Sequence, residues 1–432
     1  MENLKKQASK CMESIKQKGI DKAYCYVSSR VINEFNIDST GYYLFRTVFD
    51  NSLSVTLYNK GKKGVVSLNR FDDESISKAV DNAIAASESA SPDDAWDIAP
   101  VSRNDAFVSG CPEPDIPRLF DRAMEFLGDI SACHPKIALE QMIIKHSRTD
   151  GVYMNSNGVE FTSLSGSYTV YLDYSAQEGE KSSSFFSSWA LTDSLDKPFI
   201  ELGCIEEDLS NVEKQIFTRP VEGKFTGTVV FPPQALNSLL ESALYNFCGN
   251  TTILDGTSIW KDKLDKQVTD SRITISASPL DERIICGERF NSEGFRSENY
   301  DIIKDGVLKS FMLSSYVANK TCRERARNSS DSFIMAPGDT TVSEIIKGID
   351  RGILVGRLSG GEPATNGDFS AVAKNSFYIE NGKITNAISE TMISGNLAEI
   401  LNNVRAISKE VICDGSTVLP YAAFDNITIS GK

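Results

Sequence analysis

The architecture of the chain shows first in Thr226-Gly227-Thr228-Val229-Val230-Phe231-Pro232-Pro233, which is followed by apolar residues at helical spacing. The first six residues are rich in β-branched and aromatic side chains and predict a strand. The two prolines predict that a helix begins directly after it, because proline is tolerated in the first turn of a helix. The apolar face of this helix consists of Ala235, Leu236, Leu239, Leu240, Ala243 and Leu244. A strand followed at once by such a helix indicates helices packed on a sheet.

The residues before this stretch show the same two patterns. Helical spacing predicts helices over 1–18, 73–89, 117–130 and 204–217. Alternation of polar and apolar residues predicts short strands at 23–27, 31–35, 41–46, 52–58, 65–68, 137–145, 151–155, 159–164, 168–174 and 184–191. The run Asn155-Ser156-Asn157-Gly158 is a strong hairpin signal. Residues 100–117 are rich in Pro, Ser, Asp and Gly and predict a loop.

Strands and glycine-rich loops predominate after residue 223, with helices expected over 342–349 and 397–408. We therefore expect an α+β fold. Its N-terminal α/β region would carry helices on a mostly antiparallel sheet, and its C-terminal domain would be rich in β-structure. The length suggests two to three domains, which we place at residues 1–98, 99–222 and 223–432.

Composition excludes several classes of protein. The 432 residues carry 45 Lys and Arg against 59 Asp and Glu, a net charge of −14 that argues against direct nucleic-acid binding. No stretch is apolar for long enough to span a membrane, and the N-terminus lacks the apolar core of a signal peptide. The nine scattered cysteines predict reduced thiols in a cytoplasmic protein. Only two histidines are present, so a zinc site built wholly of histidines is excluded.

The two histidines and one glycine-rich turn are candidates for binding or catalytic sites. His146 follows a strand-like run and is expected at a strand end on the surface, and His134 is expected in a turn. The turn Arg357-Leu358-Ser359-Gly360-Gly361-Glu362-Pro363 offers backbone N–H groups to an anion. Because Glu362 is acidic and no lysine is present, a structural loop is the better interpretation.

Several short segments follow one another in an order typical of one family. They include Phe290-Asn291-Ser292-Glu293-Gly294-Phe295, Asn366-Gly367-Asp368-Phe369-Ser370 and Ile393-Ser394-Gly395-Asn396, and others lie at 228–233, 303–308, 336–339, 377–384 and 425–431. In this order and spacing the chain resembles the TldD/PmbA family, also labelled modulators of DNA gyrase. The resemblance runs through essentially the whole chain and is closest to the PmbA branch, also called TldE.

The resemblance implies a zinc-dependent peptidase system. In the TldD branch, a histidine-glutamate-three residues-histidine motif lies on the helix after the Thr-Val-Val strand, and a late cysteine is the third zinc ligand. The matching positions here are Glu241, Ser242 and Asn246. Serine is a poor general base and asparagine a weak zinc ligand. Glu241 and Cys413 remain weak candidates for a metal, and no cofactor is expected in this chain.

The resemblance further implies a barrel-like C-terminal domain and assembly into a dimer. Zinc is expected in a TldD-like catalytic partner, although a homodimer stays open. Peptide substrates are expected to bind as an added strand inside an enclosed cavity. Candidate cavity residues are Gly360, Gly361, Asp368, Phe369, Ser370, Gly395 and Asn396.

Two other functions stay open at this point. The chain could be an active metallopeptidase with an altered site that uses Glu241 and Cys413. It could also be a protein-binding modulator that acts alone, as the gyrase label suggests. The leading interpretation is a non-catalytic subunit of a cytoplasmic zinc-dependent peptidase that processes or degrades small or unfolded peptides.

Overall fold

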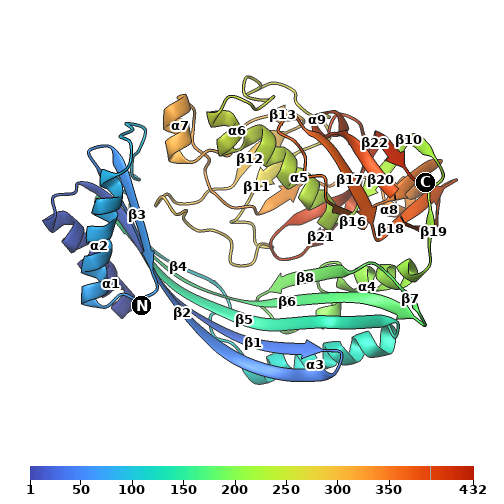
Figure 1. Cartoon of the computed structure of the whole chain (residues 1–432), viewed down its shortest axis with the longest axis horizontal. Helices are drawn as coiled ribbons and strands as arrows, with labels where there is room; N and C mark the ends of the chain where they lie inside the picture. The colour runs from blue at the N-terminus through green and yellow to red at the C-terminus, as the bar shows by residue number, and fades with distance from the viewer. Residues whose placement is uncertain (390) are drawn as a thin grey trace.

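A computed structural model of the chain describes residues 1–389 and 391–432. The described residues form a long curved sheet and a second part that lies over its concave face (Figure 1). The first sheet belongs to the N-terminal part of the chain, and the second part holds a mixed sheet. Among the described helices, none is both long and apolar enough to cross a membrane. The predicted α+β class is confirmed.

The N-terminal sheet has eight strands. Its order is β3-β2-β1-β5-β6-β4, and β7 and β8 also pair with β6. The strands are β1 (Lys22–Asp38), β2 (Gly41–Asn59), β3 (Lys62–Leu68), β4 (Asp105–Gly110), β5 (Ile137–Asn155), β6 (Glu160–Glu178), β7 (Lys181–Ser182) and β8 (Phe186–Thr192). Only the pairing of β4 with β6 is parallel among those described, which confirms the predicted, mostly antiparallel sheet.

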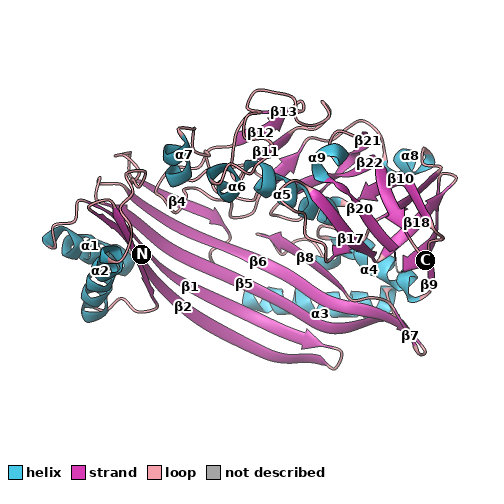
Figure 2. Cartoon of the chain, turned by 45° about the horizontal axis from the view of Figure 1, so that its top comes forward, coloured by secondary structure: helices cyan, strands magenta, loops and turns pink. Residues whose placement is uncertain are grey.

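Four of these strands are much longer than the sequence predicted (Figure 2). β1, β2, β5 and β6 contain 17, 19, 19 and 19 residues, whereas two short strands were predicted for each. The prediction broke the strands at polar runs such as Ser28-Ser29-Arg30, where alternation is lost. In the structure these three residues are at least partly exposed, so polar side chains occupy both faces and the strand continues through them.

Helices cover the convex face of this sheet. They are α1 (Glu2–Gln17), α2 (Asp73–Glu88) and α3 (Ile116–Cys133). Cys25 and Val27 of β1 pack with α1 and α2, and Phe35 packs with α3. Because successive residues of a strand point to opposite faces, Tyr24 and Tyr26 lie on the concave side. α4 (Ile205–Glu213), flanked by the 3₁₀ helices η1 (Phe199–Glu201) and η2 (Lys214–Ile216), packs against β6 and β8 at one end.

The second part is built on a mixed sheet of fourteen described strands. Their bounds are β9 (Thr218–Pro220), β10 (Lys224–Phe231), β11 (Ile275–Ala277), β12 (Tyr300–Lys304), β13 (Val307–Leu308), β14 (Phe333–Met335), β15 (Arg351–Leu354), β16 (Arg357–Ser359), β17 (Asp368–Lys374), β18 (Ser376–Glu380), β19 (Lys383–Ser389), β20 (Thr391–Asn396), β21 (Val404–Cys413) and β22 (Val418–Ser430). The helices are α5 (Pro233–Cys248), α6 (Asn250–Leu254), α7 (Ser315–Thr321), α8 (Val342–Lys347) and α9 (Leu397–Ile400).

The strand and helix predicted at 226–244 are confirmed as β10 and α5. β10 lies inside the sheet, antiparallel to β22 and parallel to β15. The apolar face of α5 is buried on this sheet, with Leu236, Leu240 and Phe247 fully enclosed. Full burial of one such side chain stabilises the fold by about 1.5–3 kcal/mol. The position of α5 is therefore fixed by the core.

Two predicted elements are wrong. The predicted loop at 100–117 contains β4, which pairs in parallel with β6. The predicted helix at 397–408 stops after the four residues of α9, and β21 follows and pairs with β22. The register of β21 shifts between Val404 and Ala406 and between Ile407 and Val411. These irregularities interrupt the two-residue period of the strand, which explains the apparent helical spacing.

Both expected domain boundaries fall between elements that belong to the same sheet. The boundary at 98/99 lies between elements of one sheet, because β1 pairs with β5 from Tyr24↔Asn155 to Ile37↔Met142. The boundary at 222/223 lies between β9 and β10, which both belong to the second sheet. The chain thus passes from the first sheet to the second through α4 and β9.

Candidate functional site

The polar face of α5 carries the positions that the sequence singled out. Glu241 is half-buried, and its carboxylate accepts a 2.8 Å hydrogen bond from Nδ2 of Asn237. Burial raises the pKa of the Glu241 carboxyl, and the carboxylates of Asp331 and Asp414 raise it further. Tyr245, one turn along the helix, donates its hydroxyl to the same Asp331. Glu241 and Tyr245 therefore face one acidic environment.

Asn246 points elsewhere. Its Nδ2 donates to the backbone oxygens of Pro363 and Ala364, at 3.2 and 3.3 Å. Glu241 is held by Asn237 on its own helix, whereas Asn246 is held by the segment at 363–364. In this structure the two side chains therefore have separate partners and do not form a chelating pair.

Cys413 lies at the end of β21. Its Sγ donates to the backbone oxygen of Arg283 at 3.4 Å. Burial raises the pKa of the thiol, which favours the neutral form, whereas a metal binds the thiolate. Within the described residues, no group of three or more His, Cys, Asp and Glu side chains is placed to hold a metal ion. The donor set at Glu241, Ser242, Asn246 and Cys413 is therefore a poor match to zinc.

The candidate cavity residues lie together at one end of the second sheet. β17 pairs with β16 and β20, and this places Phe369 opposite Gly395 and Ser370 opposite Ser394. Nδ2 of Asn396 donates to the Asp368 carboxylate at 2.9 Å. This bond and a second from Asn366 lower the pKa of Asp368.

Several of these residues have structural roles in the fold. Phe369 is 7% exposed and belongs to the core, and the Asn396 side chain caps α9. A Cβ at Gly361 would lie 1.7 Å from the oxygen of Ser370, so the close approach of the two backbones requires glycine; Gly360 beside it is exposed. The region is tied to α5 through Asn246, but the cavities described next are lined by other residues.

A cleft of two adjoining cavities, here named the inner groove, lies between the concave face of the first sheet and the second part of the chain. The cavities measure about 430 and 460 Å³ and share Tyr24, Asn291 and Ser292. The sheet contributes Tyr24, Tyr26, Ser54, Thr56, Tyr153, Ser163 and Ser165. Tyr245 of α5 lines the second cavity. Tyr245 thus brings α5 to the inner groove, whereas Glu241, Ser242 and Asn246 are not among the residues that line its two cavities.

One loop contributes to both cavities from the side opposite the first sheet. The segment Phe290-Asn291-Ser292-Glu293-Gly294-Phe295 is folded on the Asn291 side chain, whose Oδ1 accepts the N–H groups of Glu293 and Phe295. The hydroxyl of Tyr153 donates to the backbone oxygen of Glu293 at 2.9 Å. This contact joins the loop to the first sheet. The loop is one of the segments on which the sequence resemblance rests.

Gly294 provides a test of this contact. It has a φ of +88°, and a Cβ there would lie 2.3 Å from the Tyr153 hydroxyl. We expect Gly294→Ala to lower the free energy of unfolding by about 2 kcal/mol or more, because left-handed strain and a clash add together. Gly158→Ala is the matched control, since Gly158 has a φ of +87° with no atom within 4 Å. Equal losses in urea unfolding would contradict the proposed close packing of loop and sheet.

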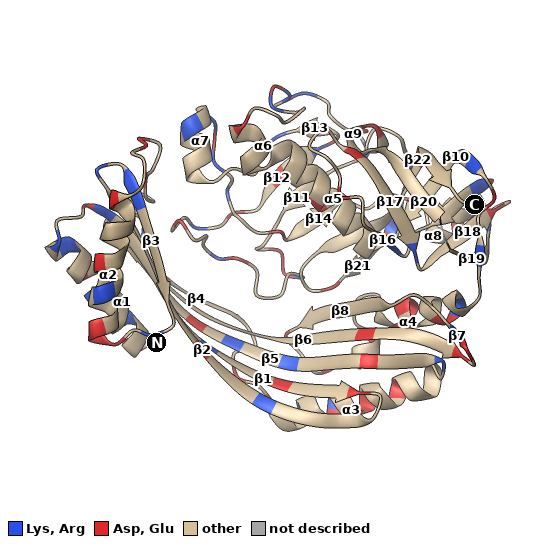
Figure 3. Ribbon diagram, viewed as in Figure 1, with Lys and Arg blue, Asp and Glu red and all other residues tan. Residues whose placement is uncertain are grey.

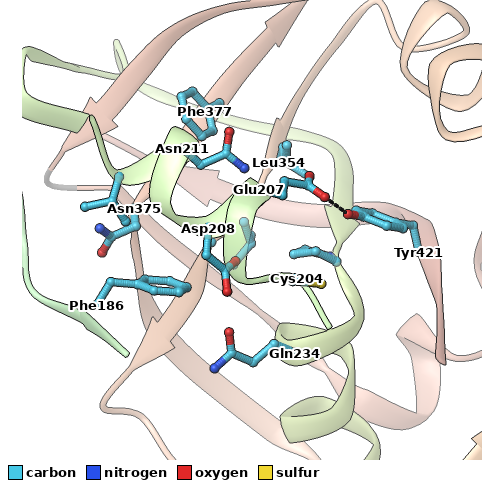
Figure 4. Close-up of a pocket in the computed structure, with 14 residues that line it drawn as sticks. Phe186, Cys204, Glu207, Asp208, Asn211, Gln234, Leu354, Asn375, Phe377 and Tyr421 are labelled. Carbon is cyan, nitrogen blue, oxygen red and sulfur yellow. Dashed lines mark hydrogen bonds between the residues drawn. The ribbon is translucent and has the colours of Figure 1, made fainter. Parts of the chain in front are cut away.

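A smaller cavity lies between α4 and the second part (Figure 4). Its volume is about 30 Å³, room for one or two water molecules but not for a peptide. Asp208 projects into it, and burial raises the pKa of its carboxyl to about 8. Oγ of Ser188 lies 2.7 Å from Oδ2 of Asp208, and Tyr421 donates to Glu207 at 2.6 Å. The cavity lies where the two parts of the chain meet, and its few polar groups are hydrogen-bonded among a mostly apolar lining.

Both histidines lie outside the inner groove. His146 is fully buried in the middle of β5, with Nε2 2.7 Å from the backbone oxygen of Cys111, so its predicted surface position is wrong. β5 continues through His146 to Asn155, whereas the sequence predicted a break in the strand at the polar run after residue 145. His134 caps α3 and lies 3.4 Å from the Glu213 carboxylate.

Comparisons with known proteins agree with this architecture. The family model described as "PmbA/TldA metallopeptidase C-terminal domain" matches residues 223–431, and that described as "PmbA/TldA metallopeptidase domain 1" matches residues 45–87. The chain belongs to the PmbA/TldD metallopeptidase family. The resemblance found in the sequence is thereby confirmed. In this PmbA/TldD chain, the C-terminal match contains the whole of α5 and the loop at 290–295.

Relatives match most of the chain. The metalloprotease PmbA of Escherichia coli O157:H7 is 24% identical over 392 residues, which cover 86% of this chain and 85% of that protein. A solved structure from Bacteroides thetaiotaomicron, described as a candidate modulator of DNA gyrase, has a TM-score of 0.88 at 22% identity and covers 100% of both chains. TldE from Thermococcus kodakarensis has a TM-score of 0.85 at 20% identity, over 98% of this chain and 100% of that one. These structures share the PmbA/TldD fold.

The sequence singled out α5 but missed the inner groove. Its walls come from β1, β2, β5, β6 and the loop at 290–295, which are far apart in the chain. A signal was present in the alternation of hydroxyl residues on one face of the strands, such as Tyr24 and Tyr26 in β1 and Ser163 and Ser165 in β6. Only the pairing of the strands reveals that these residues form one wall.

Proposed function

We propose that this chain is a PmbA/TldE-type subunit of a cytoplasmic peptidase. It binds small or unfolded peptides in the inner groove, and a TldD-type partner supplies zinc and hydrolysis. The observation that carries the proposal is the polar face of α5. Tyr245 of this face lines a groove large enough for a peptide, while Glu241, Ser242 and Asn246 offer neither a chelating pair nor a general base.

The chemistry of the inner groove suits a peptide. Its two cavities fall in the range of typical ligand sites. An extended peptide presents N–H donors and C=O acceptors along its length, and a hydroxyl group can serve either. Ser54, Thr56 and Ser163 place such hydroxyls on the wall formed by the sheet, and Tyr24 and Tyr26 add aromatic surface for apolar side chains.

A free sheet edge supports the role of a partner. β3 pairs with β2 only from Leu53 to Asn59, so in the described structure β2 has no outer neighbour between Gly41 and Ser52. Exposed apolar residues gather along this free edge, and they are Tyr42, Tyr43, Leu44, Phe45, Val48 and Phe49. Successive residues of β2 project to opposite faces of the sheet. A partner packed along the edge covers the exposed side chains on both faces. We place the TldD-type partner on this edge.

Phe49 is the most exposed of these side chains, at 75%. We expect Phe49→Asp to weaken assembly with the TldD-type partner by at least about tenfold, because a charge replaces an aromatic contact in the interface. Val108→Asp is the control, since Val108 is 67% exposed on β4 at the opposite edge of the same sheet. Analytical ultracentrifugation of the two purified chains measures the effect. Unchanged assembly of the Phe49 variant would place the partner elsewhere.

Affinity purification of the native chain tests the function itself. We expect recovery of a family member that carries the histidine motif, and cleavage of an unfolded peptide by the mixture but not by this chain alone. Peptide cleavage by the purified chain would instead identify an active metallopeptidase with an altered site. Recovery of a gyrase subunit without a TldD-type chain would identify a modulator that acts alone. The nine free cysteines agree with a cytoplasmic setting.

A further inference from the structure

A strongly basic cavity lies in the second part of the chain, outside the inner groove. It measures about 660 Å³ and we name it the basic pocket. Its cationic residues are Lys304, Lys309, Arg323, Arg325 and Arg327, and its acidic residues are Asp301 and Glu324. The chain as a whole carries a net charge of −14, and acidic and basic residues are interspersed over its elements (Figure 3). Such a local excess of positive charge favours an anionic ligand.

Two of these cations have no acidic partner within the described residues. Lys304, Lys309 and Arg327 form ion pairs with Asp301, Asp265 and Glu298, at 3.4, 2.9 and 3.2 Å. The Arg323 and Arg325 guanidinium groups donate only to the backbone oxygens of Lys261 and Ala326. Each therefore keeps further N–H donors and has no carboxylate in contact, while Glu293 and Glu298 act on the charge of Arg325 from farther away.

Aromatic rings hold both arginines in place. The guanidinium carbon of Arg325 lies 3.6 Å from the centre of the Phe295 ring, and that of Arg323 lies 4.8 Å from the Phe311 ring. Stacking on a ring orients the planar guanidinium group and leaves its edge free for an anion. Both side chains are half-buried, and burial lowers the pKa of Arg325. The pocket is thus ordered before any ligand arrives.

The basic pocket adjoins the inner groove. Tyr300 lines both, and Ala326 of the groove lies between Arg325 and Arg327 of the pocket. Phe295, which supports Arg325, ends the loop that forms the groove wall. Tyr300 and Ala326 thus separate the groove from the two guanidinium groups by one residue's thickness, and the end of a peptide at this part of the groove lies next to the basic pocket.

We propose that the basic pocket binds carboxylate groups of a peptide held in the inner groove, so that the chain selects peptides with acidic residues near one end. The proposal rests on peptide binding in the groove, as set out under the proposed function. Arginine binds carboxylate and phosphate alike. A peptide is favoured over nucleic acid because the positive charge is confined to one cavity that continues a peptide-sized groove, whereas nucleic acid requires an extended basic face.

Fluorescence anisotropy with two labelled decapeptides tests the selection. Both have amidated C-termini and six Gly and Ser residues, followed by four Glu in one and four Gln in the other. We expect the full-length chain to bind the Glu peptide at least about tenfold more tightly, since a hydrogen bond to a charged group contributes more than a neutral one. Added salt should reduce this difference.

Two variants and a matched control assign the effect to the pocket. Arg323→Gln and Arg325→Gln should each bring the affinity for the Glu peptide close to that for the Gln peptide. Arg323→Gln keeps the test valid if Arg325→Gln fails to fold. In the control, Arg351→Gln, the guanidinium carbon lies 3.7 Å from the Phe225 ring on β10 and outside the pocket, so the preference should persist.

Ser163→Trp, which fills the inner groove from the sheet, separates this proposal from the proposed function. Both peptides should bind this variant more weakly. If Ser163→Trp changes the affinity for neither peptide, peptide binding in the groove is refuted, whatever the result with the arginine variants. If Ser163→Trp weakens the binding of both peptides but wild type binds the two equally, only the basic pocket proposal is overturned. Tighter binding of a single-stranded oligonucleotide with four phosphates than of the Glu peptide would also overturn it.

Discussion

Two histidines introduced as Glu241→His and Tyr245→His should bind Zn²⁺ at least about tenfold more tightly than a pair introduced as Glu241→His and Asn246→His. Positions four apart lie on one face of α5, and Glu241 and Tyr245 have Asp331 as a common neighbour. The Asp331 carboxylate is then available as a third donor. Asn246 instead faces Pro363 and Ala364. Competition with a chromophoric chelator measures both affinities.

Single variants provide the controls for this experiment. Glu241→His alone should bind zinc more weakly than the 241/245 pair, because one imidazole gives no chelate. Asn246→His also removes two hydrogen bonds to the loop at 363–364, at about 1 kcal/mol each, so thermal unfolding must show that the paired variant is folded. Equal zinc affinity of the two pairs would mean that positions 241 and 246 converge. In that case a metal site at the family positions would be restored by two substitutions.

The second large effect is a dependence of stability on pH. Burial raises the pKa of Asp208 from 3.8 to about 8 in the folded chain. Between these values the unfolded chain releases the proton while the folded chain keeps it, so stability falls as the pH rises. From about pH 5 to about pH 8, we expect this group to remove roughly 4 kcal/mol from the free energy of unfolding. Above about pH 8 the loss levels off, because the folded chain then releases the proton as well.

Asp208→Asn isolates this contribution. The variant keeps an oxygen that can accept from Ser188 but has no proton to release. Urea unfolding at about pH 5 and about pH 8 should show a much smaller loss for the variant than for wild type. Asp73→Asn is a control for an ordinary exposed carboxylate, whose side chain is 74% exposed. Parallel losses in wild type and the Asp208 variant would show that Asp208 is ionised in the folded chain at neutral pH.

Local patterns predicted the parts of the fold that depend on neighbours in sequence. The passage from Phe231 through Pro232 into α5 was predicted because proline chemistry and apolar spacing agree there. The hairpin at Asn155 was predicted for a similar reason, and the Gly158 backbone has the positive φ that such turns require. The length of β1 and the existence of β4 depend on pairing with distant strands and were missed.

The candidate site was likewise predicted only where it depends on residues that are neighbours in sequence. The sequence placed Glu241, Ser242 and Asn246 on one helix, but the divergence of Glu241 and Asn246 follows from the partners that each finds in the folded chain. The inner groove and the Asp208 cavity arise only where the two parts meet, for example at the contact between Tyr153 and Glu293. Such contacts join residues more than a hundred positions apart, and no short-range pattern records them.

Zinc stoichiometry decides whether this chain holds a metal of its own. The purified chain and its complex with a TldD-type partner are each dialysed against trace zinc and analysed by mass spectrometry for metal per chain. We expect no zinc in this chain alone and one zinc per pair of chains in the complex. One tightly held zinc in the isolated chain, lost in a Glu241→Ala or Cys413→Ser variant, would contradict this expectation.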